Sequence, residues 1–185
     1  MSTFFTHSPL IETLISSKTR VRLLLKFFLN ASNRAYLRGL EEEFQESSNA
    51  IRVELNRFEE AGMITAQTEG NKKIFKANTR YPLFNEIHSI LMKYVGIDKI
   101  IENVLNQLGD VNEVYLTGEF AKGRDNHIID LEIIGNVNPA VLSGLVEKAQ
   151  EMLTRRVRYI VFSEEEYLAL PDTHRNSPKL LIWSK

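Results

Sequence analysis

The sequence predicts an α+β protein made of two small domains. Its first half combines three amphipathic segments of helical periodicity with two short strand-like runs. Its second half contains a strand, a glycine-containing loop and another apolar strand in succession. A chain of 185 residues, with 43% hydrophobic and 25% charged residues, is long enough to build two such cores.

Composition excludes several classes of protein. The chain contains no cysteine, which rules out a disulfide framework, a thiol nucleophile and a Cys-based zinc site. It has no run of about 18 apolar residues, so we expect no membrane span. Met1 to Leu10 has no Lys or Arg before its short apolar stretch, so we expect no secretory signal. A cytoplasmic location follows as the default.

The net charge of −1 hides a mild asymmetry. Up to Met92 the chain carries 12 Lys and Arg against 10 Asp and Glu, whereas the remainder carries 11 against 14. Neither half is charged strongly enough to coat a nucleic acid. Any DNA binding must therefore come from a local patch.

The first half reads as three helices followed by a hairpin. The predicted helices cover Ser17–Asn30, Ala35–Phe44 and about Ser48–Ala61. In the third helix, Ile51, Leu55 and Phe58 recur at helical spacing, and Gly62 ends it. Two strands, Met63–Thr68 and Lys73–Ala77, flank the polar turn Glu69–Lys72.

This order of elements resembles a winged helix-turn-helix domain. The residues that carry the resemblance are Ser47 to Ile51, Leu55, Phe58 and Glu60 to Ile64. The last run is similar to the end of the recognition helix in metal-sensing and multidrug-resistance repressors. In that family the third helix enters the DNA major groove, and the hairpin "wing" touches the backbone or minor groove. The resemblance covers roughly residues 15–80 and implies binding to double-stranded DNA.

Residues off the apolar face of the third helix are the candidate DNA contacts. Asn and Arg side chains can each make paired hydrogen bonds to base edges, and Ser48 with the first helix amides can hold a phosphate. Lysines at the wing tip can reach phosphates. The predicted DNA-binding residues are Ser48, Asn49, Arg52, Asn56, Lys72 and Lys73. Glu54, which we also place nearer solvent, opposes binding, as do Glu59 and Glu60. The competing interpretation is a solvated helix face and a charged turn.

A helix over Leu83–Val95 joins the two halves. Its apolar stripe serves either as a homodimer contact or as ordinary core packing. Gly96 interrupts the pattern before a further helix, Ile97–Leu108. We place the two domains at residues 1–95 and 96–185.

The second half resembles the minimal nucleotidyltransferase domain. That family has a Gly-Ser-x-Ala-Arg-Gly loop, followed by a strand reading Ser-Asp-Ile-Asp-Leu. The matching residues here are Gly118, Ala121, Lys122, Gly123, Asp130, Leu131 and Gly135, with Lys in place of Arg. The resemblance implies a small α/β domain with a mixed sheet. The predicted strands are Val111–Thr117, Ile128–Ile134 and Arg156–Phe162, with a helix over Asn138–Leu153 and a capping box at Ser163–Glu166. The segment Lys179–Trp183 is either a last strand or an apolar tail that docks on the domain.

Three departures from the family pattern predict that this domain is catalytically inactive. In active members, two aspartates on the second strand and a carboxylate on the third hold two magnesium ions. Here Ile128 takes the place of the first aspartate, and Arg158 takes that of the third-strand acid. Glu119 replaces the loop serine and would repel a triphosphate. We therefore expect no catalytic residues, no metal and no cofactor.

In one alternative interpretation, the second domain is an enzyme. Asp130 and Glu132 lie two residues apart on a strand and so share a face. With Glu119 they could form a shifted acid cluster for Mg²⁺ and a nucleoside triphosphate, next to the nucleotide-loop-like residues Gly118, Glu119, Lys122 and Gly123. The simpler interpretation has Asp130 held by backbone amides of the glycine loop, with Glu132 exposed.

The sequence therefore predicts a cytoplasmic, homodimeric transcriptional regulator that binds double-stranded DNA. Its second domain would serve dimerisation or the sensing of a small-molecule ligand. Two alternatives stay open: a magnesium-dependent nucleotidyltransferase, and an adaptor whose winged helix binds protein.

Overall fold

The computed structural model describes residues 15–108, 110–153 and 155–185. The stretch Met1–Leu10, which bears on the predicted lack of a secretory signal, lies outside the described residues. The chain divides into two compact units, an N-terminal unit that ends at Leu91 and a C-terminal unit that continues from Met92. Helix α5 (Phe84–Val95) contains this division.

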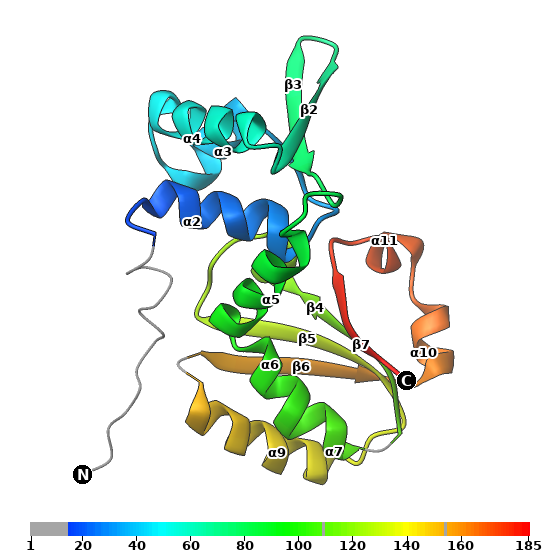
Figure 1. The fold of residues 1–185 in the computed structure, drawn as a ribbon. Helices are drawn as coiled ribbons and strands as arrows, with labels where there is room; N and C mark the ends of the chain where they lie inside the picture. The colour runs from blue at the N-terminus through cyan, green and yellow to red at the C-terminus, as the bar shows by residue number, and fades with distance from the viewer. Residues whose placement is uncertain (1–14, 109, 154) are drawn as a thin grey trace, which may run out of the picture. The chain divides into compact units, whose positions relative to one another are not determined.

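The N-terminal unit contains the three helical segments and the hairpin that the sequence predicts (Figure 1). Its elements are α2 (Lys18–Leu24), η1 (Leu25–Leu29), β1 (Arg34–Tyr36), α3 (Leu37–Phe44), α4 (Ser48–Glu60), β2 (Ile64–Glu69) and β3 (Lys72–Ala77). The strands form one antiparallel sheet in the order β1-β3-β2.

Burial explains two departures from the predicted helices. The segment predicted as one α-helix continues as the π-helical turn η1, in which Phe27, Phe28 and Leu29 are all fully buried. The predicted second helix loses its first residues to β1, whose Ala35 pairs with Phe75 of β3. In α4 the prediction is confirmed, because Ile51, Leu55 and Phe58 are at most 4% exposed.

The C-terminal unit is built on a four-stranded mixed sheet. Its elements are α6 (Ile97–Ile100), η2 (Ile101–Leu105), α7 (Asn106–Leu108), β4 (Val111–Thr117), α8 (Gly118–Ala121), β5 (Ile128–Gly135), α9 (Pro139–Met152), β6 (Arg156–Phe162), α10 (Glu164–Ala169), α11 (Asp172–Arg175) and β7 (Leu180–Ser184). The strand order is β6-β5-β4-β7, with β5 and β6 parallel and the other pairs antiparallel. The predicted α+β class with a mixed sheet is confirmed.

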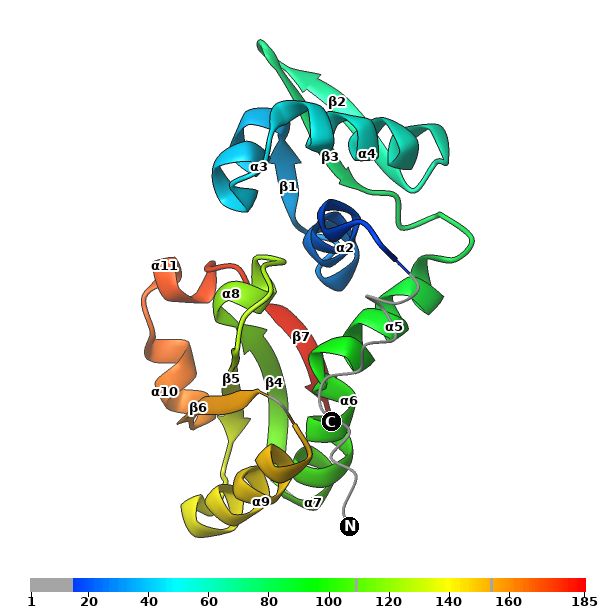
Figure 2. The ribbon, with the colours of Figure 1, turned by 90° about the vertical axis from the view of Figure 1, so that its left-hand side faces the viewer.

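Helices flank this sheet in more than one place. Figure 2 shows α9 and α7 near one end of the unit and α10 and α11 along another side. Strand β5 buries Ile129, Leu131 and Ile133, while α9 buries Leu142, Val146 and Ala149. Helical spacing from Asn138 to Leu153 predicts that Val141 and Met152 also face inward, but this prediction is wrong, since they are 48% and 53% exposed. The predicted capping box at Ser163 is confirmed.

Among the helices in the described ranges, none has the length and apolar character required to span a membrane.

Candidate functional site

A groove of about 530 Å³ lies on the surface of the N-terminal unit. Helices α3 and α4, the end of β1 and the β2–β3 hairpin all contribute to it. Its lining residues are Tyr36, Leu37, Arg38, Glu41, Arg52, Leu55, Asn56, Asn71, Lys72, Lys73 and Phe75. Four of these side chains are cationic and one is anionic, so the groove favours an anionic ligand.

Four of the six predicted DNA-binding residues line this groove: Arg52, Asn56, Lys72 and Lys73. Asn49, Arg52 and Asn56 are exposed and follow one another at spacings of three and four residues, which places them on one stripe of α4. Ser48 and Asn49 do not line the groove. The residue that caps α4 is Ser47, whose hydroxyl accepts a hydrogen bond from the Ala50 amide, so Ser48 is the first helical residue.

The cations of the groove differ in whether they already form an ion pair with an acid of this chain. Among the described residues, Arg52 has no ion-pair partner, and it is exposed. Lys72 Nζ lies 4.3 Å from the centre of the Tyr36 ring, a cation–π contact that leaves its charge uncompensated. Lys73 Nζ instead lies 2.7 Å from Glu59 Oε2. Arg52 and Lys72 are therefore better placed than Lys73 to meet a polyanion.

Sequence reasoning missed Arg38, which also lines the groove. Its side chain is 84% exposed and lies 3.9 Å from Glu42 on the same helix. Arg38 belongs to α3, a helix from which no DNA contact was predicted. The signal that could have found it is the polar face of that helix, which carries no other cation.

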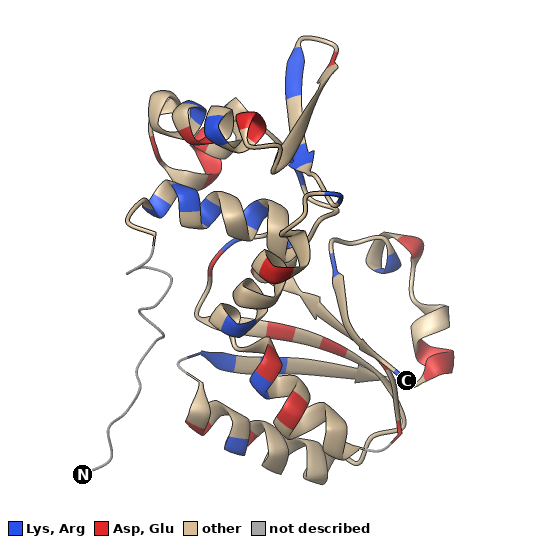
Figure 3. Cartoon of the chain, in the orientation of Figure 1, with Lys and Arg blue, Asp and Glu red and all other residues tan. Residues whose placement is uncertain are grey.

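Glu54 is buried, contrary to the sequence prediction that it lies nearer solvent. Its side chain is 8% exposed and accepts hydrogen bonds from Arg20 Nε at 2.9 Å and from Arg57 at 3.1 Å. Burial raises the pKa of Glu54, but its hydrogen bond with Arg20 and the charges of Arg20 and Arg57 outweigh burial, so the net pKa is lowered. The carboxylate therefore ties α4 to α2 and does not oppose an anionic ligand. Figure 3 shows Lys and Arg along α2, α4 and β3.

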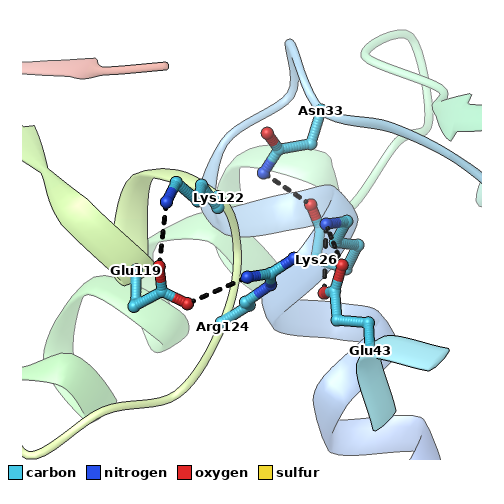
Figure 4. Close-up of polar contacts among 6 residues, drawn as sticks. All are labelled: Lys26, Asn33, Glu43, Glu119, Lys122 and Arg124. Carbon is cyan, nitrogen blue, oxygen red and sulfur yellow. Dashed lines mark hydrogen bonds and ion pairs between the residues drawn. The ribbon is translucent and has the colours of Figure 1, made fainter. Parts of the chain in front are cut away.

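In the C-terminal unit, Glu119 of the glycine loop after β4 is paired with two cations of the same loop. Glu119 accepts hydrogen bonds from Lys122 Nζ at 2.9 Å and from Arg124 at 3.1 Å (Figure 4). The hydrogen bond from Lys122 lowers the pKa of Glu119, burial opposes the shift, and Arg124 adds to it. Gly118 and Gly123 take left-handed conformations, with φ of +65° and +74°, which lets the loop turn tightly around this ion pair.

Asp130 and Glu132, the residues of the alternative acid cluster, each lie beside a cation of this chain. Parallel pairing of β5 with β6 sets Asp130 opposite Arg158, and the two side chains lie 2.7 Å apart. This ion pair corrects the prediction that backbone amides of the glycine loop hold Asp130. The prediction that Glu132 is exposed is also wrong, because it is 3% exposed and accepts a hydrogen bond from His174 Nε2 at 2.7 Å.

Glu132 lies among aromatic and cationic side chains. Lys179 Nζ lies 3.6 Å from Glu132 and contacts the rings of Tyr115 and Tyr167, 4.6 and 4.7 Å from their centres. Burial and the hydrogen bond to Glu113 raise the pKa of Tyr115 to about 12, so its phenol stays protonated. These contacts cover Glu132 with residues from the C-terminal end of the chain.

The residues at this site do not fit a pair of magnesium ions. Across residues 15–108, 110–153 and 155–185, no three His, Asp or Glu side chains converge to hold a metal. Magnesium binds carboxylates that keep access to water, whereas Glu132 is enclosed and Asp130 is paired with Arg158. Glu119 is paired with Lys122 and Arg124, so the three acids act as separate ion pairs.

No protein-family model and no curated protein matches the sequence. Two solved structures match about half of this chain. One is a mutant of the MntA–HpeT toxin–antitoxin pair, with a TM-score of 0.38 and 15% identity, over 48% of this chain and 72% of that one. The other is a candidate nucleotidyltransferase from Sulfolobus solfataricus, with a TM-score of 0.35 and 23% identity, over 51% and 83%. Both TM-scores are low, so neither likeness assigns a function to this chain.

Proposed function

We propose that this protein is a DNA-binding transcriptional regulator that contacts duplex DNA through the groove of its N-terminal unit. The observation that carries the proposal is the convergence of Arg38, Arg52 and Lys72, from three separate elements, on one groove beside Asn56 and Asn71. Cations from the helices and hairpin can contact phosphates, while Arg52 and Asn56 can read base edges.

The order of elements supports a winged helix-turn-helix as the DNA-binding domain. Helices α3 and α4 would form the helix-turn-helix, with α4 as the recognition helix and the β2–β3 hairpin as the wing. The ion pairs of Glu54 with Arg20 and Arg57 support this role, because they keep this buried acid of α4 away from the exposed stripe of the helix.

For the C-terminal unit we propose a nucleotidyltransferase-like domain without catalytic activity, which serves dimerisation or the sensing of a small-molecule ligand. The ion pairs at Glu119, Asp130 and Glu132 support this role, because the carboxylates that would bind a metal are paired with basic side chains of the same chain.

The experiment that tests the proposal is selection of sequences from random duplex DNA by the full chain, followed by fluorescence anisotropy at two salt concentrations. We expect an enriched inverted repeat and an affinity that falls steeply with salt. Arg52→Ala should weaken binding to the selected site by about tenfold to a hundredfold, the cost of losing one paired contact to a base.

Arg57→Ala is the matched control, since it removes the same charge from the same helix. Arg57 is 58% exposed and turned toward Glu54, so its loss should change affinity by less than about twofold. Equal losses in both variants would mean that α4 contributes only diffuse charge. If no sequence is enriched and binding occurs only at low salt, the groove becomes a protein-contact surface, as the adaptor alternative requires.

The alternative of magnesium-dependent nucleotidyl transfer through Asp130 and Glu132 has a direct test. We expect no binding heat when ATP and Mg²⁺ are titrated into the full chain, because both carboxylates are held by cations of the chain. The same titration into Asp130→Ala is the control. Heat with the wild type that disappears in Asp130→Ala would restore the enzyme as the leading interpretation.

A further inference from the structure

Strand β6 forms one edge of the sheet in the C-terminal unit. Within the described residues, the strand order β6-β5-β4-β7 gives it a single neighbour, β5 (Figure 1). The Arg156 amide donates to the His127 carbonyl at 2.9 Å, which fixes the phase of the parallel ladder. Residues 156, 158, 160 and 162 therefore bond to β5, while 157, 159 and 161 point their amides and carbonyls outward.

Two of these outward residues leave a short stretch of backbone open. At the start of the strand, Gln150 Oε1 accepts a hydrogen bond from the Val157 amide at 2.9 Å. Just beyond its end, the Ser163 amide donates to Glu166 in the capping box. Among the described residues, the outward amides of Tyr159 and Val161 have no partner.

The centre of this edge, Tyr159 to Phe162, carries no charged side chain to protect it. Exposed edge strands usually carry Lys, Pro or a bulge, which stop a further strand from pairing. Here Tyr159 and Ile160 are 37% and 50% exposed, and the pairing of β6 with β5 runs without a register shift from 156 to 162. The edge is therefore regular, apolar at its centre and able to accept another strand.

The charges beside the edge match those of a second, antiparallel copy. Arg156 lies at the start of the strand, is exposed, and its guanidinium has no ion-pair partner among the described residues. Glu164 and Glu165 lie just past the end of the strand, in the first turn of α10, and are also exposed. A two-fold axis would bring the basic start of each strand toward the acidic end of the other.

We propose that a second copy of this chain pairs with β6 in antiparallel orientation, with Tyr159 at the two-fold axis. The amide and carbonyl of Tyr159 bond to those of the partner's Tyr159, and the Val161 amide donates to the carbonyl of the partner's Val157. The Val157 amide keeps its hydrogen bond to Gln150, so the Val161 amide alone bonds across the pair of Val161 with the partner's Val157. This inference does not rest on the proposed DNA binding, since it concerns the protein alone.

Sedimentation velocity of the full chain over a wide range of concentrations tests the dimer. The wild type should reach twice the single-chain mass of 21.3 kDa. Tyr159→Pro removes an outward amide, which an edge strand tolerates but a second strand needs, so this variant should stay at the mass of one chain. Its far-UV circular dichroism should match that of the wild type.

A charge exchange keeps the test valid if Tyr159→Pro fails to fold. Arg156→Glu should weaken the dimer by about tenfold, because the pair occurs twice in a symmetric dimer. Adding Glu164→Arg and Glu165→Arg to this variant should restore it. Dimerisation that survives both Tyr159→Pro and Arg156→Glu overturns the proposal, as does a wild type that stays monomeric at every concentration.

Ile90→Lys separates this surface from the alternative dimer contact on α5. Ile90 is 52% exposed and Ile160 is 50% exposed, so the two isoleucines are matched in accessibility. Ile160→Lys should weaken the dimer, and Ile90→Lys should leave it unchanged. The reverse result would assign the interface to α5 and refute the pairing of β6.

Discussion

Replacing Gly135 by alanine is expected to lower the free energy of unfolding by about 2–4 kcal/mol, which combines backbone strain with a steric clash. Gly135 ends β5 with φ of +152°, a conformation that residues with a side chain rarely adopt. An added Cβ would lie 2.4 Å from the Asp110 carbonyl oxygen and 2.9 Å from Val111 Cα. Both are backbone atoms, so no rotation of a side chain relieves the clash.

The measurement is denaturant unfolding followed by the fluorescence of Trp183, the single tryptophan, which lies in β7 of the same unit. Gly144→Ala is the matched control. Gly144 lies inside α9, and among the described residues no atom outside the helix's own nearby backbone would lie within 4 Å of an alanine Cβ there. Alanine is the better helix former, so this change should raise the free energy of unfolding by about 0.5–1 kcal/mol. Unfolding of Gly135→Ala at the wild-type denaturant concentration would contradict the strain argument.

Phe28→Ala is expected to destabilise the N-terminal unit by about 3–5 kcal/mol, the usual cost of truncating a fully buried phenylalanine. The Phe28 ring is fully buried and lies 5.4 Å from the ring of Phe84, measured between centres. Its carbonyl accepts a hydrogen bond from His88 Nδ1 at 2.8 Å. The alanine variant therefore leaves a cavity at the point where η1 meets the start of α5.

Far-UV circular dichroism measures this loss, while Trp183, which lies in the other unit, reports whether the C-terminal unit is affected. Leu83→Ala is the control, because Leu83 is 53% exposed and its truncation should cost less than about 0.5 kcal/mol. A Phe28→Ala variant as stable as Leu83→Ala would show that η1 repacks around the missing ring.

Local patterns determined the elements whose residues bond to near neighbours along the chain. Helix α4 follows from the spacing of Ile51, Leu55 and Phe58, and the capping box at Ser163 follows from a serine with a glutamate three residues later. Strand β5 follows from its apolar run. These features depend on periodicity and short-range hydrogen bonds, which a sequence displays directly.

Elements that depend on distant partners were missed or misjudged. Strand β1 exists because Arg34 to Tyr36 pair with β3, about forty residues later in the chain, and nothing local distinguishes it from the start of a helix. The π-helical turn η1 accommodates Phe27 and Phe28 together in the core, which an α-helical stripe does not predict.

The candidate sites divide in the same way. The sequence by itself determined that Arg52, Asn56 and Lys72 belong to a polar helix face and a hairpin, and that Ile128, Glu119 and Arg158 depart from a metal-binding pattern. Only the tertiary structure decided that Arg38 lines the groove, that the buried Glu54 pairs with Arg20, and that His174 and Lys179 contact the buried Glu132. The physical reason is that the charge state and exposure of a side chain depend on groups that folding brings near it, often from far along the chain.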